Sequence, residues 1–276
     1  KRMSGFDTLW LPGTGHASIA TEAKIVEAMR NEGISKEDLG RDGFLERAWD
    51  WKKQYGGRII EQLKKLGSSC DWDRERFTLD EGCSKAVNEV FCRLYEKDLI
   101  YRGNRMVNWC PCCNTSISDA EVEYEEQDGS FWHLLYTVKE TGEKLELATT
   151  RPETMLGDTA VAINVADERY KHLHGCHVIL PLLNKEIPIV CDEHADMTKG
   201  TGVVKITPAH DPNDFEVGKR NNLPVVRTFT YDGHLTGAED KRIADELIKS
   251  GKAAADEPEV LDCGKYAGMT TLEARK

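Results

Sequence analysis

Two short segments hold most of the side chains in this chain that could do chemistry together. Residues 148–154 read Ala-Thr-Thr-Arg-Pro-Glu-Thr, and residues 205–214 read Lys-Ile-Thr-Pro-Ala-His-Asp-Pro-Asn-Asp. Each segment joins a strand-forming run to a proline turn, and functional side chains concentrate where strands end and loops begin. We predict that the two segments form the walls of one polar pocket, lined by hydroxyls, a guanidinium, an imidazole and carboxylates.

The acidic pair in the second segment has two interpretations. Asp211 precedes Pro212, a pattern typical of a helix N-cap, and Asp214 then falls on the first helical turn, where the helix dipole favours a carboxylate. Alternatively, a carboxylate beside His210 and Lys205 can bind a ligand ammonium or position a water molecule. Spacing alone favours capping, and both roles are compatible if Asp211 caps the helix while Asp214 faces the pocket.

The first segment supplies one cation and three hydroxyls. Because Pro152 disfavours a helical conformation at Arg151, we expect this arginine to leave the end of a strand. Its fork of donors suits phosphate or carboxylate recognition, although it can equally pair with Glu153 or Asp158. The hydroxyls belong to Thr149, Thr150 and Thr154. They have two interpretations, ordinary strand or turn residues and the lining of a polar pocket.

One cysteine pair has the spacing of half a zinc site. Cys110 and Cys113 form a Cys-x-x-Cys pair, whereas a tetrahedral zinc ion needs two further ligands, and the other Cys and His residues are scattered. Nine cysteines without a regular framework favour reduced thiols or a metal site over disulfides. Free thiols and a metal site both remain open.

The elements that must position these residues change in type along the chain. Helices are predicted at residues 17–32, along an apolar stripe from Phe44 to Leu66, and after a Thr78-x-x-Glu81 capping box. We expect the apolar residues of the third helix to face a core, namely Val87, Val90, Phe91 and Leu94.

After an acidic join near residues 124–129, short β-type runs take over. They cover residues 131–138, 145–149, 159–165, 177–183, 186–190, 202–206 and 225–230. Several short strands at this spacing predict a compact barrel or sandwich, with helices at 212–221 and 240–250 beside it. The predicted fold class is therefore α/β plus β-barrel.

Composition narrows the classes of function. The 276 residues carry a net charge of −11, which argues against nucleic-acid binding over the whole surface but leaves room for a local basic patch. The chain has neither a membrane-length apolar run nor a signal-peptide pattern, so we expect a cytoplasmic protein. The abrupt ends, including a Thr270-x-x-Glu273 capping box close to the last residue, predict a fragment of a longer protein.

Motifs along the chain resemble those of the valyl-tRNA synthetases, a family of class I aminoacyl-tRNA synthetases. Residues 10–21 read Trp-Leu-Pro-Gly-Thr-Gly-His-Ala-Ser-Ile-Ala-Thr, residues 107–111 Val-Asn-Trp-Cys-Pro, and residues 118–123 Ser-Asp-Ala-Glu-Val-Glu. The two pocket segments follow in family order. Isoleucyl and leucyl relatives share the Thr-Arg-Pro-Glu-Thr type of segment, whereas residues 207–218 are most similar to the valyl branch.

The resemblance implies an architecture. Residues 1–124 would be a partial Rossmann-type catalytic domain with its connective stalk, 125–265 an inserted β-barrel editing domain, and 266–276 the start of a truncated return segment. The parent enzyme would be a monomer that attaches valine to tRNA(Val) with ATP and Mg²⁺. Neither the His-Ile-Gly-His-type nor the Lys-Met-Ser-Lys-Ser-type ATP signature is present. We therefore do not expect this piece to activate valine alone.

The resemblance also implies an editing reaction. An apolar pocket cannot strongly reject threonine in favour of the similarly shaped valine, so a second site must hydrolyse threonyl-tRNA(Val). The acceptor end of tRNA(Val) would enter the barrel, and a positioned water, aided by the ribose hydroxyl, would attack the ester. Asp214 matches the position that holds the substrate's α-ammonium. The implied catalytic group is Lys205, Thr207, His210 and Asp214, and the implied substrate-binding group is Thr149, Thr150, Arg151, Thr154 and Asp211.

One departure from the family sequence, one incomplete metal site and two alternative functions qualify this expectation. Gly15 stands where the family usually has an aspartate of the synthetic site, which puts valine activation in doubt even in the parent chain. Family members that bind zinc at the positions of Cys110 and Cys113 complete the site with cysteines beyond residue 276, so we predict an unfilled half-site and no cofactor for editing. The alternatives are an isoleucyl- or leucyl-type editing fragment and a non-catalytic tRNA-binding module.

Overall fold

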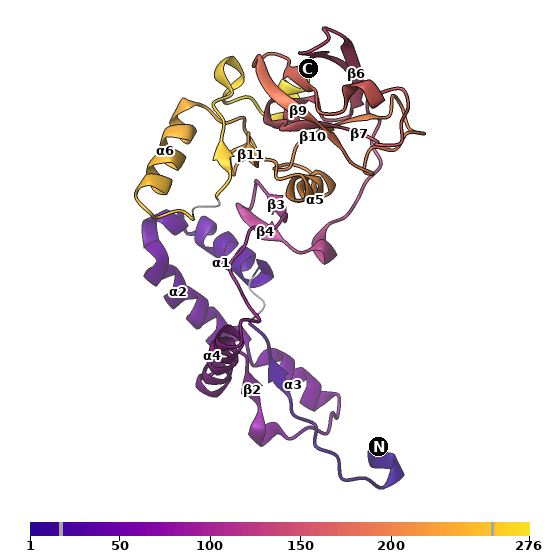
Figure 1. Cartoon of the computed structure of the whole chain (residues 1–276). Helices are drawn as coiled ribbons and strands as arrows, with labels where there is room; N and C mark the ends of the chain where they lie inside the picture. Colours follow the sequence, from indigo (N-terminus) through magenta and orange to yellow (C-terminus); the bar gives the residue numbers. More distant parts are fainter. Residues whose placement is uncertain (17–18, 255–256) are drawn as a thin grey trace. The chain divides into compact units, whose positions relative to one another are not determined.

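The chain forms two compact units, residues 1–102 and residues 103–276 (Figure 1). The computed structural model describes residues 1–16, 19–254 and 257–276, and each unit is described by itself below. The predicted functional limits at 1–124, 125–265 and 266–276 concern domains of the parent enzyme and stay predictions. Among the described residues, none of the helices combines the length and apolar content that crossing a membrane requires.

Unit 1 is mainly helical, as its periodicity predicts. Its helices are α1 (Ile19–Asn31), α2 (Lys36–Tyr55), α3 (Arg58–Lys65) and α4 (Glu81–Glu96), and its strands are β1 (Gly13–Thr14) and β2 (Arg76–Phe77). The two strands form a short parallel pair. The expected end of the first helix is confirmed, because Gly33 adopts the left-handed conformation there, whereas its expected start at residues 17–18 lies outside the described residues.

The apolar stripe from Phe44 to Leu66 does not form the single helix that we predicted. Gly56 and Gly57 separate α2 from α3, which changes the face that each helix buries. Ile59 is 55% exposed and Leu66 is 82% exposed, whereas Ile60 is 4% exposed. A continuous 3.6-residue period cannot be extended across two glycines, because glycine carries a low helix propensity.

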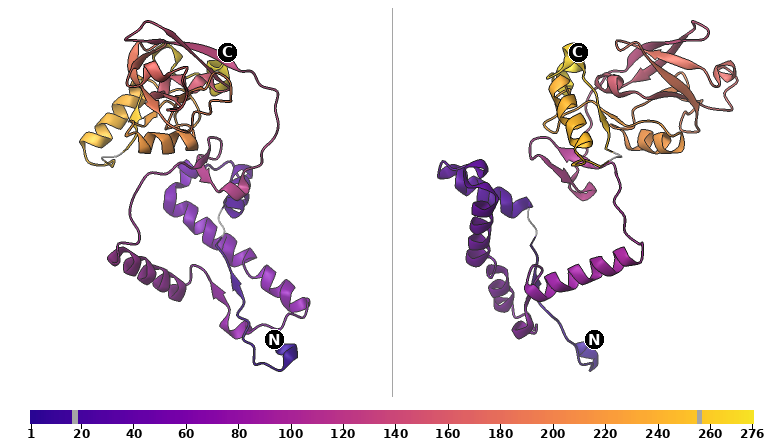
Figure 2. Two further views of the ribbon diagram at one scale, coloured as in Figure 1. Left: turned by 45° about the vertical axis from the view of Figure 1, so that its right-hand side comes forward. Right: turned by 60° about the vertical axis from the view of Figure 1, so that its left-hand side comes forward.

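The predictions for α4 were wrong in two respects. Its N-cap is Asp80, whose side chain accepts a hydrogen bond from the Cys83 amide, and not Thr78. Its apolar side chains were expected to face a core, yet Val87, Val90 and Phe91 are 63%, 55% and 62% exposed. Periodicity shows which face of a helix is apolar but not what covers that face, and α4 stands apart from α1–α3 in both views of Figure 2.

Unit 2 is built on a six-stranded sheet, which confirms the predicted barrel. Its strands are β5 (Trp132–Val138), β6 (Lys144–Thr149), β7 (Ala160–Ile163), β8 (His177–Leu180), β9 (Lys185–Cys191) and β10 (Val203–Ile206). They follow the order β10-β7-β9-β8-β5-β6, antiparallel except for the parallel pair β7–β9. The two end strands, β10 and β6, also contact each other, so the sheet is nearly closed.

The barrel core forms because apolar residues alternate along the strands. Tyr136, Val138, Leu145 and Leu147 from the β5–β6 hairpin point inward and are almost fully buried. Outside the barrel, α5 (Pro212–Arg220) packs Val217 against Ile206 and the alanines of β7. Both views of Figure 2 show α5 close to the strands. This packing fixes the first turn of α5 beside the end of β10.

Unit 2 contains further elements outside the six-stranded sheet. They include the hairpin β3 (Asn108–Cys110) and β4 (Thr115–Ile117), the parallel pair β11 (Val226–Arg227) and β12 (Glu259–Val260), and the helices α6 (Ala238–Lys249) and α7 (Thr271–Ala274). The capping box at Thr270 is confirmed, since its hydroxyl accepts from the Glu273 amide. The predicted strand at 225–230 is shorter than expected and lies outside the six-stranded sheet.

Candidate functional site

A buried polar network links the two sequence segments. The Lys205 ammonium donates to the Thr154 hydroxyl over 2.8 Å and to Asp158 over 3.2 Å, and it also bonds the Thr207 hydroxyl. Asp158 accepts from the Thr207 hydroxyl over 2.5 Å and from Tyr136 over 2.6 Å. All three N–H bonds of Lys205 are therefore used inside the protein, and this lysine acts by positioning its neighbours.

Asp158 and Tyr136 belong to the network, although sequence reasoning did not assign them to the site. Asp158 was considered only as a partner of Arg151, and Tyr136 only as part of a strand. Asp158 is 1% exposed, so burial raises the pKa of its carboxyl, while Lys205 and the hydroxyl donors offset part of that effect. The sequence did offer one signal for Asp158, which is a carboxylate just before a wholly apolar strand. Such a charge is buried only when it is paired, so a buried partner was to be expected.

Asp214 lies at the open end of this network. Its Oδ2 accepts from the Thr207 amide over 2.9 Å, while its Oδ1 lies 3.5 Å from Nε2 of His194. The residue is 6% exposed, and burial raises the pKa of its carboxyl. Asp211 caps α5 by accepting from the amides of Asn213 and Asp214, as predicted. The capping role of Asp211 is thus confirmed, while Asp214 is a buried acid with one lightly engaged oxygen whose binding role stays a prediction.

His210 holds the second segment in place and is held as a neutral imidazole. Its Nε2 accepts from the Thr228 amide over 3.1 Å, so the proton must lie on Nδ1. Burial and the nearby cations Arg151, Lys205 and Arg227 lower the pKa of His210 to about 3. An imidazole whose free nitrogen already accepts an amide proton is poorly placed to act as a general base.

The low pKa of His210 predicts a measurable acid sensitivity. The unfolded imidazole binds a proton near pH 6.5 and the folded one near 3, so stability is present above pH 6.5 and falls as the pH drops between these values. Between pH 7 and pH 5 we expect His210 to account for a loss of about 2 kcal/mol. His210→Gln should lack this part of the loss in urea denaturation. The exposed His172→Gln, a matched control, should retain it.

Arg151 and Glu153 occupy the rim of the network. Arg151 donates to the carbonyl of His210 over 2.7 Å, and its Nε lies 3.5 Å from Glu153. Glu153 is 3% exposed and receives two hydrogen bonds from Arg275, at 2.6 and 3.1 Å. The predicted pairing of Arg151 with Glu153 is therefore present, although Arg275 is the closer partner. About half of the Arg151 side chain remains exposed, with donors free for a ligand.

Removal of Arg275 should weaken the rim. Arg275→Met leaves the buried Glu153 with only the distant Arg151, and we expect a loss of about 2 kcal/mol in the free energy of unfolding, because a buried carboxylate loses charge-assisted hydrogen bonds. Chemical denaturation measures this loss. Glu153→Gln in the Arg275→Met background should recover part of the stability, and no recovery would contradict the assignment of the loss to an unpaired Glu153.

The three threonines of the first segment take different positions. Thr149 is 9% exposed and accepts from the Arg151 amide over 3.0 Å, so it shapes the turn. Thr154 is 2% exposed and bonds both Lys205 and the Arg151 carbonyl. Thr150 is the exposed one of the three and is the threonine most open to a ligand.

Cys110 and Cys113 lie together at the turn of the β3–β4 hairpin. The Cys113 amide donates to the Cys110 sulfur over 3.3 Å, which lowers the pKa of the Cys110 thiol. Within the parts of the chain that the structure describes, no third His, Cys, Asp or Glu completes a group suited to a metal ion. Two thiols alone do not fit a tetrahedral zinc site. We predict less than one zinc per purified chain, and metal analysis that finds one would contradict this.

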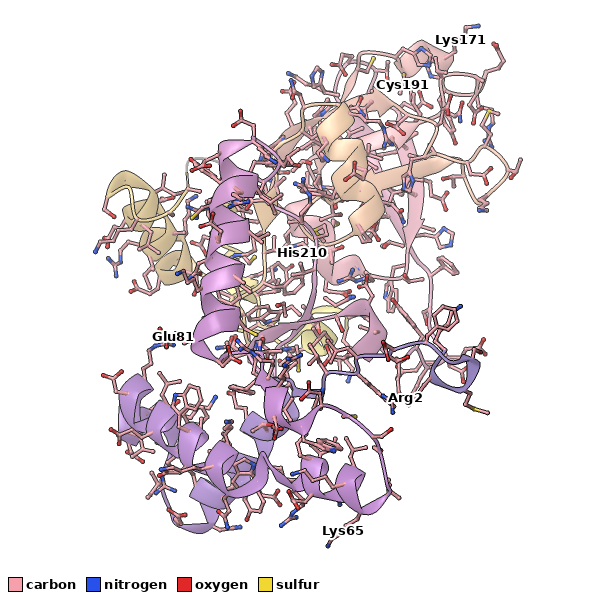
Figure 3. All side chains as sticks on the ribbon, turned by 90° about the horizontal axis from the view of Figure 1, so that it is seen from below. Arg2, Lys65, Glu81, Lys171, Cys191 and His210 are labelled. Carbon is pink, nitrogen blue, oxygen red and sulfur yellow. The ribbon has the colours of Figure 1, made fainter. Side chains whose placement is uncertain are left out.

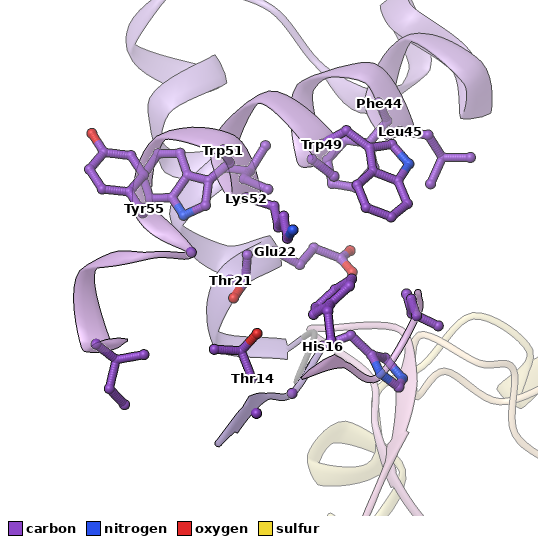
Figure 4. Close-up of a pocket in the computed structure, with 18 residues that line it drawn as sticks. Thr14, His16, Thr21, Glu22, Phe44, Leu45, Trp49, Trp51, Lys52 and Tyr55 are labelled. Atoms are coloured by element: carbon purple, nitrogen blue, oxygen red, sulfur yellow. The ribbon is translucent and has the colours of Figure 1, made fainter. Parts of the chain in front are cut away.

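Each unit contains a hollow. The hollow of unit 2 measures about 720 Å³, and its lining residues are Cys191, Asp192, Glu193, His194, Asn213, Glu216 and Arg220. Two of its lining residues are neighbours of Asp214, because His194 lies 3.5 Å from Asp214 and Asn213 precedes it in the chain. Figure 3 labels Cys191 from this lining and His210 from the second segment. The hollow of unit 1 measures about 610 Å³, and its lining includes Gly15 and the aromatic residues Trp49, Trp51 and Tyr55 (Figure 4). A side chain at position 15 would meet no atom within 4 Å, so the glycine is not required by packing.

The arrangement in unit 2 suits recognition of a cationic group next to an anionic or hydroxylated one. Asp214 offers a desolvated carboxylate oxygen, and Arg151 offers a half-exposed guanidinium beside His210. Such groups bind and orient a ligand. The Thr207 hydroxyl has the Asp158 carboxylate within hydrogen-bonding distance, but each of these residues is only 1% exposed, so the arrangement favours positioning and electrostatic stabilisation over nucleophilic attack.

Comparison with known proteins places the chain in a family. The model of the tRNA synthetases class I (I, L, M and V) matches residues 1–264. The valine--tRNA ligases of Carboxydothermus hydrogenoformans and Clostridium tetani are 55% and 54% identical over 276 residues, which is all of this chain and 29% of each relative. That of Geobacter sulfurreducens is 55% identical over 263 residues, covering 91% of this chain and 30% of the relative.

A solved structure was also found, the LeuRS of Agrobacterium radiobacter K84 in a LeuRS–tRNA–LeuAMS ternary complex. It covers 82% of this chain and 37% of that chain, with 18% identity and a TM-score of 0.33, and a match of this size carries no argument. The family match and the sequence identity do not depend on it. The chain therefore belongs to the class I tRNA synthetases, and it is similar to valine--tRNA ligases along its whole length.

Proposed function

We propose that unit 2 is an editing site that hydrolyses threonyl-tRNA(Val), within a longer valine–tRNA ligase. The chain spans less than a third of the length of its curated relatives, so the ligase reaction with valine, ATP and Mg²⁺ is part of this proposal. The family supports tRNA as the partner. We also propose that the protein works in the cytoplasm as a monomer and that editing needs no cofactor.

One observation carries the editing proposal: Asp214 is a buried carboxylate with an oxygen that no cation among the described residues fully engages. Oδ2 is fixed by the Thr207 amide, while the partner that the structure describes for Oδ1 is His194 at 3.5 Å. A buried carboxylate without a cation is costly, and burial accordingly raises its pKa. The α-ammonium of an aminoacyl ester would supply the missing charge. A helix-capping role does not explain Asp214, because Asp211 already caps α5.

The other residues would hold the ester for hydrolysis. With the ammonium on Asp214, the ester carbonyl faces the segment 205–210, and Arg151 and Thr150 lie on the rim for the terminal adenosine. A water positioned there attacks the carbonyl carbon, and the ribose oxygen leaves with a proton, with the neighbouring ribose hydroxyl assisting. Lys205, Thr154 and Thr207 keep Asp214 in place through their shared network. The rate gain would come from orientation.

The test is deacylation of threonyl-tRNA(Val) by this chain. We expect the ester to disappear faster than in buffer, with valyl-tRNA(Val) much less affected. Faster loss of a mischarged isoleucine- or leucine-type tRNA would instead favour a relative of those branches. Binding of tRNA without deacylation would identify a tRNA-binding module and contradict the proposal.

A further inference from the structure

The loop after β9 brings a histidine against the proposed amine site. His194 Nε2 lies 3.5 Å from Asp214 Oδ1, the same oxygen that the substrate's ammonium would use. The His194 side chain is 29% exposed, so solvent protons reach it, whereas Asp214 is buried. An imidazole changes its charge near neutral pH, unlike any other unperturbed side chain. The charge beside Asp214 is therefore variable.

The position of His194 is fixed by its own loop. Its amide donates to Asp192 over 3.0 Å, and Asp192 in turn accepts from Arg220 over 2.9 Å and from Asn221 over 3.1 Å. The guanidinium of Arg220 is the main reason that the pKa of Asp192 is lowered. The loop is thereby clamped to the end of α5, whose first turn carries Asp214. His194 and Asp214 are thus held together by the same helix.

The other charged groups facing His194 come from two elements. The loop after β9 contributes Asp192 and Glu193, and α5 contributes Glu216 and Arg220. Asp192 is already paired with Arg220, and Glu216 lies 3.3 Å from Lys219. Glu193, which lines this hollow, is an exposed acid, whereas Asp214, 3.5 Å from His194, is buried. The positive charge of a protonated His194 is therefore paired first with the carboxylate of Asp214.

We propose that His194 gates the amine site, because its imidazolium and the substrate's ammonium compete for the same oxygen of Asp214. Neutral His194 leaves Oδ1 to the substrate and borders the site as a weak hydrogen-bond partner. Protonated His194 forms an ion pair with Asp214, and the substrate must displace it. His194 is then a positioning residue that makes editing fall as the pH drops. This inference rests on the proposed editing function.

The test compares the pH profiles of wild type and His194→Gln in deacylation of threonyl-tRNA(Val). Between about pH 7.5 and pH 5.5 we expect the wild-type KM to rise about tenfold relative to the variant, with similar kcat. Both proteins share the titration of the substrate amine, so their ratio reports the His194–Asp214 pair. His194→Lys, with a permanent cation, should show the high KM at both pH values.

The control variant is His172→Gln, which removes an exposed histidine paired with Glu143 on the same barrel and should match wild type. Identical pH profiles for wild type and His194→Gln would overturn the gating proposal while leaving editing intact, provided that Asp214→Asn still lowers the deacylation rate at least about tenfold. A wild-type chain without any deacylation would overturn the editing function and the gate with it. A KM for His194→Lys equal to that of wild type at pH 7.5 would also contradict the gate.

Discussion

Asp214→Asn is expected to lower the rate of threonyl-tRNA(Val) deacylation by ten- to a hundredfold without unfolding the protein. The variant removes the charge that meets the substrate's ammonium, and a hydrogen bond to a charged group contributes about 1.5–3 kcal/mol. The asparagine oxygen can still accept from the Thr207 amide, and the shape of the site is kept. The measurement is the initial rate of ester loss at neutral pH.

The same variant should hold or raise the free energy of unfolding. Burial raises the pKa of Asp214, so the native state binds its proton more readily than the unfolded state. The contribution of Asp214 to the free energy of unfolding therefore falls as the pH rises through the pKa of the folded state. Asparagine, which has the same shape and no charge, removes this pH dependence. Asp196→Asn, which changes a partly exposed acid in the loop before β10, should leave the deacylation rate unchanged. A fully active Asp214→Asn variant would contradict the amine site.

Asp158→Asn is expected to destabilise unit 2 by about 3–5 kcal/mol, because it leaves the buried Lys205 without its carboxylate partner. Asp158 and Lys205 are 1% and 9% exposed, and their Nζ–Oδ1 distance is 3.2 Å. For a domain of this size, such a loss lowers the melting temperature by about 10 °C or more. Differential scanning calorimetry of the whole chain measures the transition.

A double variant separates charge from packing. Asp158→Asn combined with Lys205→Met removes both charges, and we expect it to be more stable than Asp158→Asn alone. The exposed pair Lys139–Glu186 provides the control, since Glu186→Gln should cost less than about 1 kcal/mol. If Asp158→Asn melts at the wild-type temperature, the buried network does not hold the site together.

The sequence predicted the barrel and its local motifs well because these depend on neighbouring residues. The alternation of β5 and the Asp211–Pro212 cap of α5 are both local patterns, and the structure confirms them. The break at Gly56–Gly57 was also readable in principle. The sequence could not show whether Thr78 or Asp80 caps α4, because both are good capping residues.

The centre of the site could not be predicted in the same way. Asp158 meets Tyr136 across 22 residues of sequence, Lys205 across 47 and Thr207 across 49, and only the closure of the barrel brings them together. His194 reaches Asp214 because its loop is tied to Arg220 and Asn221 at the far end of α5. Chains of such long-range contacts leave no periodic signal in a single sequence.

The most direct test of the account is a side-by-side deacylation assay with threonyl-tRNA(Val) and valyl-tRNA(Val), using this chain and its Asp214→Asn variant. We predict rapid loss of the threonyl ester with the wild-type chain, slow loss of the valyl ester, and a rate for the variant that is ten- to a hundredfold lower. Equal rates for the two esters, or equal rates for wild type and variant, would contradict the assignment of Asp214 to a proofreading site.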